Sequence, residues 1–436
     1  MRNRWLAAAV SLLVFLLFMD GCDRNGQNHP DQTTELEQES ISAGPVSVET
    51  APFVLQNPRK PKRITAQQAQ LVFDRSSAKG EAKNIRYLSH FSGDLFCTSY
   101  AGLDGEPDSN ASRFAVYDGR TRRMTPVGRI ADTGVSSGDA VFMAGRYFYT
   151  WYGSADAGGV DINNLIRIDT REKTFTIVEK RKNVTALINL SKLSETEFIG
   201  YVPSQKGDSV VTEIEKYDGT TGKRKTILQN QFFYQEGEQN SRGTVLEVAC
   251  AADGKLYGLG RQKKNGEDHC YLYTYDGSGK LLSQTEEPEI GKEIGSPLHM
   301  DTVGNLLIVT DYSSLRAALF LRQGAHYVRV FGAEQYDFAG GLETLYDSAK
   351  TPYLYFQKNS LSWPEEAGKS IFYAVHTQTG EITKLQADID PKYPFLDRIH
   401  MDENGNLLLI YLQKMYDQDF KAYKISGEAL ESSLAQ

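Results

Sequence analysis

Histidine is the residue in this sequence best suited to bind a metal ion or to transfer a proton. The chain contains 7 histidines, at positions 29, 90, 269, 299, 326, 376 and 400. No two of them lie at the short spacings that zinc motifs use. His299 and His400 occupy matching places in two similar segments, but we expect these segments to lie too far apart to share one ion. The sequence therefore predicts no metal site and no cofactor.

Two other short patterns carry chemistry in some proteins. Gly134-Val-Ser136-Ser-Gly138 has the spacing of a nucleophile elbow, but that elbow needs a helix after the serine, and here a strand is predicted to follow. The loop from Gly102 to Asn110 has oxygen-bearing side chains at alternate positions, as in a calcium loop, but it lacks the closing glutamate. We predict no catalytic residue, and the sequence favours a protein without enzymatic activity over an enzyme.

A set of mostly aromatic side chains recurs near the ends of predicted strands. Because these positions repeat at similar intervals, we expect the side chains to meet on one face, next to long polar loops. Aromatic rings give a large contact area at a small entropic cost. We predict that they line a ligand-binding funnel, and the alternative is that they pack between repeated units. The set comprises Tyr100, Trp151, Tyr152, Tyr201, Arg261, Tyr312, Trp363 and Tyr411.

A repeat of about fifty residues must position these side chains. Its clearest copies are the segments 297–309 and 398–410, PLHMDTVGNLLIV and RIHMDENGNLLLI. Each copy reads as a strand, a tight turn with glycine, and a second strand, which is typical of a hairpin. A second hairpin follows in each unit, so each unit is predicted to form a four-stranded antiparallel sheet.

One four-stranded sheet per 40 to 50 residues, about the repeat length found here, is typical of a β-propeller blade. We therefore predict an all-β fold, a single propeller with seven four-stranded blades; six or eight blades are the alternatives. The strand-like segment Ala69 to Asp74 precedes the first full unit, and we expect it to pair with the last blade and close the ring.

The two PxHMDxxGNLLxV-like segments resemble the repeats of the NHL and TolB-like propeller superfamily, which includes the gluconolactonase-like enzymes. The resemblance extends over roughly residues 86–434. It implies an extracytoplasmic binding scaffold or, less often, a metal-dependent lactone hydrolase. The metal-binding Glu and Asn residues of those hydrolases match no motif in this chain.

The N-terminus resembles a bacterial lipoprotein signal. Arg2 and Arg4 precede an apolar run of about 15 residues, which is shorter than the roughly 20 residues that span a bilayer, and Gly21-Cys22 follows it. We predict a signal peptide at 1–21, lipid attachment at Cys22, a disordered tether at 22–66 and the propeller at 67–436. The alternative is an ordinary signal peptide with a chance cysteine. The predicted location is extracytoplasmic, anchored to the bacterial cell membrane.

The remaining cysteines, Cys97, Cys250 and Cys270, are predicted to be free and mostly buried. A predicted strand between Cys250 and Cys270 would hold them about 9.5 Å apart, which is too far for a disulfide.

Composition limits the function further. The net charge of −8, from 48 basic and 56 acidic residues, offers no basic surface for nucleic acid. We predict a membrane-tethered, non-catalytic binding or scaffold module for a peptide, glycan or protein partner. The alternative is a metal-dependent, lactonase-like hydrolase.

Overall fold

The computed structural model describes residues 60–435, which belong to one compact body, Thr50–Gln436. Within this range it leaves out residues 86–87, 89, 101–110, 156–160, 183–189, 207–208, 234–241, 244, 292–295, 302, 312–315, 333–349, 358–369 and 415–418.

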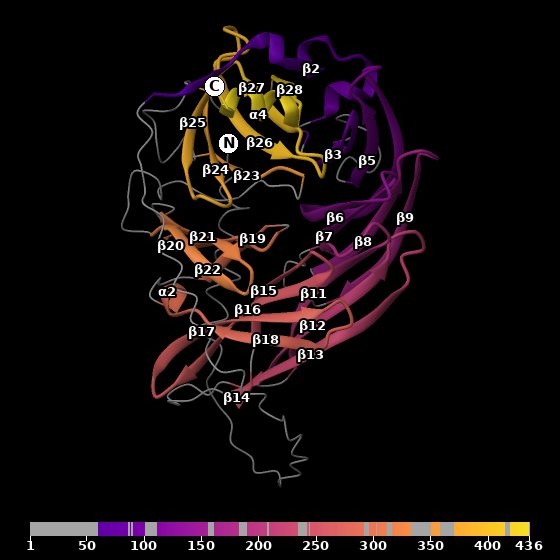
Figure 1. Cartoon of the computed structure of the whole chain (residues 1–436). Helices are drawn as coiled ribbons and strands as arrows, with labels where there is room; N and C mark the ends of the chain where they lie inside the picture. The colour runs from indigo at the N-terminus through magenta and orange to yellow at the C-terminus, as the bar shows by residue number, and fades with distance from the viewer. Residues whose placement is uncertain are drawn as a thin grey trace. The chain divides into compact units, whose positions relative to one another are not determined.

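The described strands form six sheets, numbered here in chain order and labelled by strand in Figure 1. Sheet 1 comprises β3 (His90–Ser92), β4 (Leu95–Tyr100), β5 (Ala111–Asp118), β6 (Arg123–Met143), β7 (Tyr147–Ala155), β8 (Asp161–Asp169) and β9 (Thr174–Lys182). Sheet 2 comprises β10 (Leu190–Lys192), β11 (Glu197–Lys206), β12 (Ser209–Asp218), β13 (Arg224–Phe233) and β14 (Arg242–Gly243). Sheet 3 comprises β15 (Val245–Ala252), β16 (Lys255–Lys264), β17 (Glu267–Asp276) and β18 (Leu281–Glu286).

The other sheets have four strands each. Sheet 4 comprises β19 (Ser296–Met300), β20 (Leu306–Asp311), β21 (Arg316–Gln323) and β22 (His326–Phe331). Sheet 5 comprises β23 (Tyr353–Phe356), β24 (Ile371–His376), β25 (Ile382–Ala387) and β1 (Lys62–Ile64). Sheet 6 comprises β26 (Phe395–Met401), β27 (Leu407–Leu412), β28 (Phe420–Ile425) and β2 (Ala69–Asp74). The short helices are η1 (Ala66–Gln68), η2 (Arg75–Ser77), η3 (Gly80–Asn84), α2 (Pro288–Gly291) and α4 (Gly427–Ala435).

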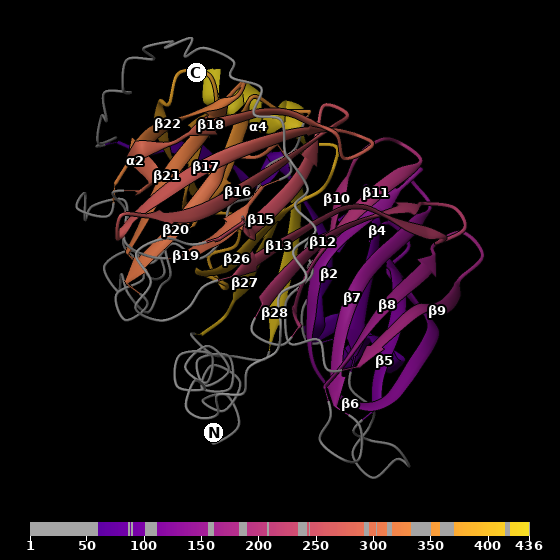
Figure 2. The ribbon, with the colours of Figure 1, turned by 90° about the horizontal axis from the view of Figure 1, so that it is seen from below.

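This architecture is an all-β propeller, as predicted, but the count of seven separate blades is wrong because the described residues form six sheets. The difference arises at β6, which has 21 residues. β6 pairs with β5 through its first half and with β7 through its second half, so the first two predicted units share one strand. Figure 2 shows β5 to β9 as one continuous, twisted sheet.

The repeated sequence HMDxxGN is a turn motif. In β19–β20, one carboxylate oxygen of Asp301 accepts backbone N–H groups from Val303 (3.1 Å) and Asn305 (2.7 Å), and the Asn305 amide donates to the other oxygen at 2.8 Å. Asp402 and Asn406 repeat the arrangement in β26–β27. Gly304 has φ +88, which favours glycine at this position. The motif therefore fixes the hairpins.

The sheets are apolar on both faces, because successive residues of a strand point to opposite sides. All six residues of β27 are buried. Leu407, Leu409 and Tyr411 pack in a cluster with sheet 5, whereas Leu408 and Ile410 pack with sheet 1. Comparable clusters join sheets 1 and 2, 2 and 3, 3 and 4, and 4 and 5. The described clusters therefore connect the sheets in a closed ring.

Strands from the two ends of the chain close this ring. β2 pairs with β28 in antiparallel register, which confirms the predicted role of Ala69–Asp74. Val72 and Phe73 of β2 are buried between sheet 6 and sheet 1. β1 adds a parallel strand to β25, so pairing begins at Lys62, inside the segment 22–66 that was predicted to be tether. No helix among the described residues is long and apolar enough to cross a membrane.

The three described cysteines, Cys97, Cys250 and Cys270, are buried and form no disulfide with one another. As predicted, β16 separates Cys250 of β15 from Cys270 of β17. Burial also raises the pKa of the Cys97 thiol, so this side chain acts as a small apolar group.

Candidate functional site

The predicted aromatic funnel is not formed by the described residues. Its described aromatic members are buried, which contradicts the expected exposure around a channel mouth: Tyr100, Trp151, Tyr152, Tyr201 and Tyr411. Arg261 is partly exposed in β16. Tyr312, Trp363 and Cys22 lie outside the described residues.

The physical reason at Trp151, Tyr201 and Tyr411 is that a neighbouring sheet covers the end of the strand. Tyr411 packs between sheets 5 and 6, and its hydroxyl donates to the Ala387 carbonyl of sheet 5 at 2.7 Å. Tyr201 packs between sheets 2 and 3, and its hydroxyl donates to the Leu246 carbonyl. A buried tyrosine hydroxyl needs such a partner. These described aromatics therefore adopt the alternative role, packing between units.

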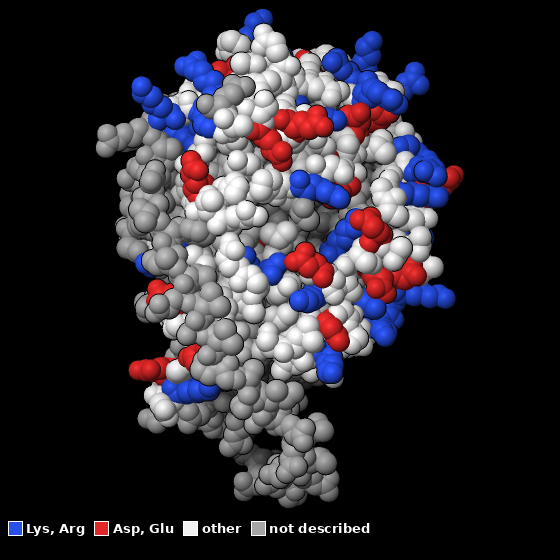
Figure 3. Space-filling model, in the orientation of Figure 1, with Lys and Arg blue, Asp and Glu red and all other residues white. Residues whose placement is uncertain are grey.

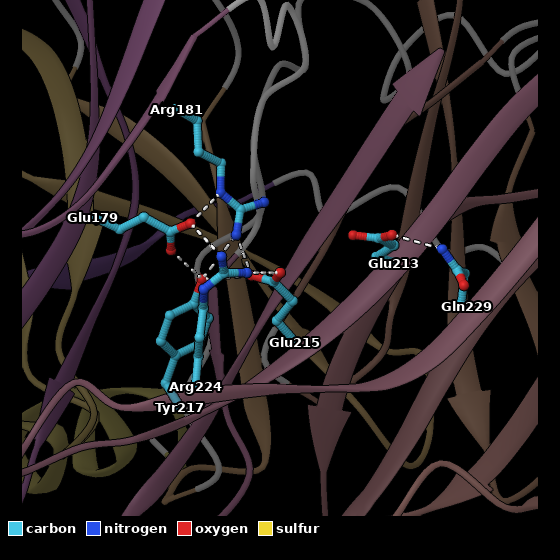
Figure 4. A network of polar contacts seen from close by, with 7 residues as sticks. All are labelled: Glu179, Arg181, Glu213, Glu215, Tyr217, Arg224 and Gln229. Atoms are coloured by element: carbon cyan, nitrogen blue, oxygen red, sulfur yellow. Dashed lines mark hydrogen bonds and ion pairs between the residues drawn. The ribbon is translucent and has the colours of Figure 1, made fainter. Parts of the chain in front are cut away.

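A polar network joins sheets 1 and 2 beside Trp151 (Figure 4). The Arg181 guanidinium lies 5.4 Å from the Trp151 ring centroid and donates to Glu179 at 2.6 Å and to Glu215. Arg224 pairs with the same two carboxylates, contacting Glu179 at 3.1 Å. The two arginines and two glutamates balance in charge.

The Tyr217 hydroxyl completes this network. It donates to Glu215 at 2.7 Å, and burial together with the nearby Glu215 charge raises the pKa of Tyr217. A separate hydrogen bond of 2.7 Å joins Gln229 to Glu213 in the same view (Figure 4). Since the charges of the network satisfy one another, we assign it to holding sheets 1 and 2 together.

A different polar group forms where the first and last sheets meet. Ser92 at the end of β3 donates to the Glu403 carboxylate, and the Gly93 N–H donates to Asp402 at 3.0 Å. His90 of β3 and His400 of β26 lie close enough to interact electrostatically. We call His90, Ser92, His400 and Glu403 the closure cluster. All four residues are of intermediate exposure, but the Nε2 atom of His400 is itself buried.

Burial shifts the titration of this cluster. It lowers the pKa of His90 to about 4 and that of His400 to about 3, and the neighbouring His90 charge contributes to the second shift. Burial raises the pKa of Glu403, against the opposing effect of the Ser92 hydrogen bond. Both imidazoles are therefore neutral at pH 7, and each has one N–H donor and one nitrogen acceptor.

The closure cluster thus combines hydroxyl, carboxyl and neutral imidazole groups on residues of intermediate exposure. Such groups can form hydrogen bonds with hydroxyl or amide groups of a ligand, and shifted pKa values often occur at functional sites. Among the described residues, no group of three or more His, Cys, Asp or Glu side chains is placed to hold a metal ion.

The expectation that His299 and His400 lie too far apart to share an ion cannot be followed among the described residues. The side chain of His299 is outside the described residues, and the residue that approaches His400 is His90. The sequence does contain a signal for the His90–His400 pair. HFSGD at 90–94 and HMDEN at 400–404 both carry histidine before a predicted hairpin turn. Ring closure, which brings the last unit beside the first, makes these two positions neighbours.

Surface charge does not indicate another site on the face shown in Figure 3. Lys and Arg side chains are interspersed with Asp and Glu side chains over the described residues of this face. A polyanion would favour a continuous basic patch instead.

Replacing Tyr411 should reduce stability. We expect Tyr411→Ala to lower the free energy of unfolding by about 3–5 kcal/mol, because it empties a fully buried site. Tyr411→Phe should cost only about 0.5–1.5 kcal/mol, since the Ile389 N–H also donates to the Ala387 carbonyl. Denaturant unfolding measures both values. Leu282→Ala, at a half-exposed leucine, is the control; an equally small effect of Tyr411→Ala would contradict burial of the ring.

The lowered histidine pKa values predict a loss of stability in acid. Between pH 6.5 and about 4, the unfolded chain binds protons at His90 and His400 that the folded chain does not bind. Folding stability should therefore fall as pH falls, by at most about 1.4 kcal/mol per pH unit for each histidine. His400→Asn should show a shallower fall in melting temperature between pH 7 and pH 5. Identical slopes for both proteins would contradict the shift.

Comparisons with known proteins give no family for this chain, since no protein family and no curated protein match it. Several solved structures are similar. Polysaccharide lyase Uly1 is 10% identical with a TM-score of 0.48, covering 83% of this chain and 98% of that one. Oligogalacturonate lyase from Vibrio parahaemolyticus is 11% identical with a TM-score of 0.42, covering 79% and 89%. The β-propeller domain of the Trilobed protease from Pyrococcus furiosus is 10% identical with a TM-score of 0.38, covering 67% and 81%.

Proposed function

We propose that this protein is a membrane-tethered, extracytoplasmic binding module whose ligand contacts the closure cluster. The observation that carries the proposal is a partly exposed polar cluster with two neutral imidazoles, held on a closed ring of packed sheets. The ring holds His90 and Ser92 of sheet 1 beside His400 and Glu403 of sheet 6, so little ordering is needed on binding.

The chemistry of the cluster favours an uncharged polar ligand. Two neutral imidazoles and the Ser92 hydroxyl match the hydroxyl groups of a glycan or the amide groups of a peptide. An anionic ligand would gain no ion pair from these neutral imidazoles. Neutral glycans and peptides are therefore the first ligand classes to test.

Binding to arrays of neutral oligosaccharides and of peptides tests this function. We expect the chain to retain at least one neutral ligand and His400→Ala to weaken its binding by tenfold or more. His269→Ala, in β17 and outside the closure cluster, should bind as the unchanged protein does. Equal binding by all three proteins would place the ligand elsewhere. Conversion of a bound lactone or glycan into product would favour the hydrolase alternative.

The membrane tether depends on Cys22. The motivation is the apolar run that ends at Gly21-Cys22 and the polar segment that follows it. We expect Cys22→Ala to abolish labelling by a radioactive fatty acid and to move the protein from the membrane fraction to the soluble fraction. Labelling that persists in Cys22→Ala would contradict lipid attachment at this residue.

A further inference from the structure

The net charge of −8 conceals an uneven distribution of charge along the chain. Residues 118–129, 167–182 and 215–225 contain the hairpin turns between β5 and β6, between β8 and β9, and between β12 and β13. Together they carry 14 Lys and Arg residues against 6 Asp and Glu residues, a surplus of 8 positive charges. Basic residues are therefore concentrated on three consecutive hairpins of an otherwise acidic chain.

Most of the basic residues on these hairpins are exposed, and most of the acidic ones are not. Ten of the 14 basic residues are exposed, whereas Glu172 and Asp218 are the exposed ones among the 6 acidic residues. Asp218 accepts hydrogen bonds within its own turn, and Glu172 lies 3.5 Å from Arg146. Glu179 and Glu215 belong to the charge-balanced network between sheets 1 and 2. These hairpins therefore present a positive surface to solvent.

The three hairpins lie side by side. Gly128 of β6 approaches β9 so closely that a Cβ added to it would lie 2.3 Å from Cγ of Phe175. Arg167 of β8 donates to the Thr220 carbonyl in the β12–β13 turn at 2.6 Å. β9 lies at the right edge of both Figure 1 and Figure 2, so Figure 3 shows this surface only from the side. We call the surface formed by residues 118–129, 167–182 and 215–225 the basic rim.

Aliphatic side chains are exposed within the basic rim and beside it. Among the described residues, the exposed large apolar side chains are Ile177 (43%), Leu281 (43%) and Leu282 (50%). Ile177 belongs to β9, inside the rim, and the two leucines belong to β18. The β17–β18 turn reaches β13, since a Cβ added to Gly279 would lie 2.1 Å from the Ile227 carbonyl oxygen. Exposed apolar and basic groups therefore share one side of the ring.

We propose that the basic rim docks onto the anionic headgroups of the membrane to which the protein is tethered, an inference that rests on the proposed membrane location. Clustered Lys and Arg residues are attracted to anionic lipid, and aliphatic side chains among them enter the boundary between headgroups and acyl chains. A soluble polyanion would use the charges but would leave Ile177, Leu281 and Leu282 in water. The combination therefore favours a lipid surface as the partner.

Co-sedimentation with vesicles tests this contact on the full chain carrying Cys22→Ala, so that no lipid anchor contributes. We expect vesicles of equal parts phosphatidylglycerol and phosphatidylcholine to bind this protein at least tenfold more tightly than vesicles of phosphatidylcholine alone. The second vesicles measure any contribution of the apolar run near the N-terminus. Added salt should weaken binding to the anionic vesicles, because it screens exposed charges.

Charge reversal on the rim identifies the surface that makes the contact. A triple variant replaces one exposed residue in each hairpin turn: Arg120→Glu, Arg171→Glu and Lys223→Glu. We expect it to bind the anionic vesicles at least tenfold more weakly. Its melting temperature should stay close to that of the parent protein, because exposed side chains contribute little to packing.

A matched control reverses the same number of charges outside the basic rim. The residues, which are exposed around β26 and β27, give the variant Lys392→Glu, Arg398→Glu and Lys414→Glu. This variant has the same net charge as the rim variant. It should therefore lose much less binding than the rim variant if position on the surface, and not total charge, decides the contact.

Replacement of Ile177 separates a lipid surface from a soluble polyanion. We expect Ile177→Ser to weaken binding to the anionic vesicles and to leave any binding to heparin unchanged. Docking on lipid would be overturned by anionic vesicles that do not bind, by equal losses in the two triple variants, or by full vesicle binding of Ile177→Ser. Since Cys22 is replaced in every protein compared, these results do not depend on lipid attachment or on a ligand at the closure cluster.

Discussion

The pairing of β2 with β28 is the interaction on which the rest of the structure depends. Each sheet is apolar on both faces, so an open row of sheets would leave two apolar faces in water. Closing the row into a ring buries both of these faces. The N-terminal strand β2 places Val72 and Phe73 between the last sheet and the first. The Tyr117 hydroxyl of sheet 1 then donates to the Val72 carbonyl at 3.0 Å, which ties the first sheet to the closing strand.

The same constraint explains why tyrosines are numerous and buried. Several of them cross from one sheet to the next and donate to a backbone carbonyl there, as Tyr149 does to Gly219 at 3.2 Å. The aromatic ring of each such tyrosine buries apolar surface between two sheets, and its hydroxyl hydrogen bond fixes how the two sheets are aligned. One polar group, the closure cluster, lies where the first and last sheets meet.

Much of the fold could be predicted from local patterns. The hairpin turns at Gly304 and Gly405, the all-β class and the closing strand Ala69–Asp74 follow from periodicity, turn residues and the need to bury both faces. The number of sheets could not be predicted in the same way, because no local signal shows that β6 continues from one unit into the next. A sequence repeat shows how many units there are, but it does not show whether two neighbouring units share an edge strand.

The candidate site was harder to predict, because it combines residues from opposite ends of the ring. Aromatic recurrence pointed to Tyr201 and Tyr411, but recurrence is also what interface packing produces. His90 and His400 are separated by almost the whole propeller in sequence, and only closure makes them neighbours. A site of this kind follows from topology rather than from spacing.

Hydrogen exchange of the native protein tests the central claim, that the closing strand is an integral part of the ring, most directly. If β2 completes the ring, its amide groups should exchange as slowly as those of β27 and β28 and should be released in the same cooperative opening. Rapid exchange of the β2 residues Ala69–Asp74 while β27 remains protected would contradict the account, because it would show a ring that is stable without its closing strand.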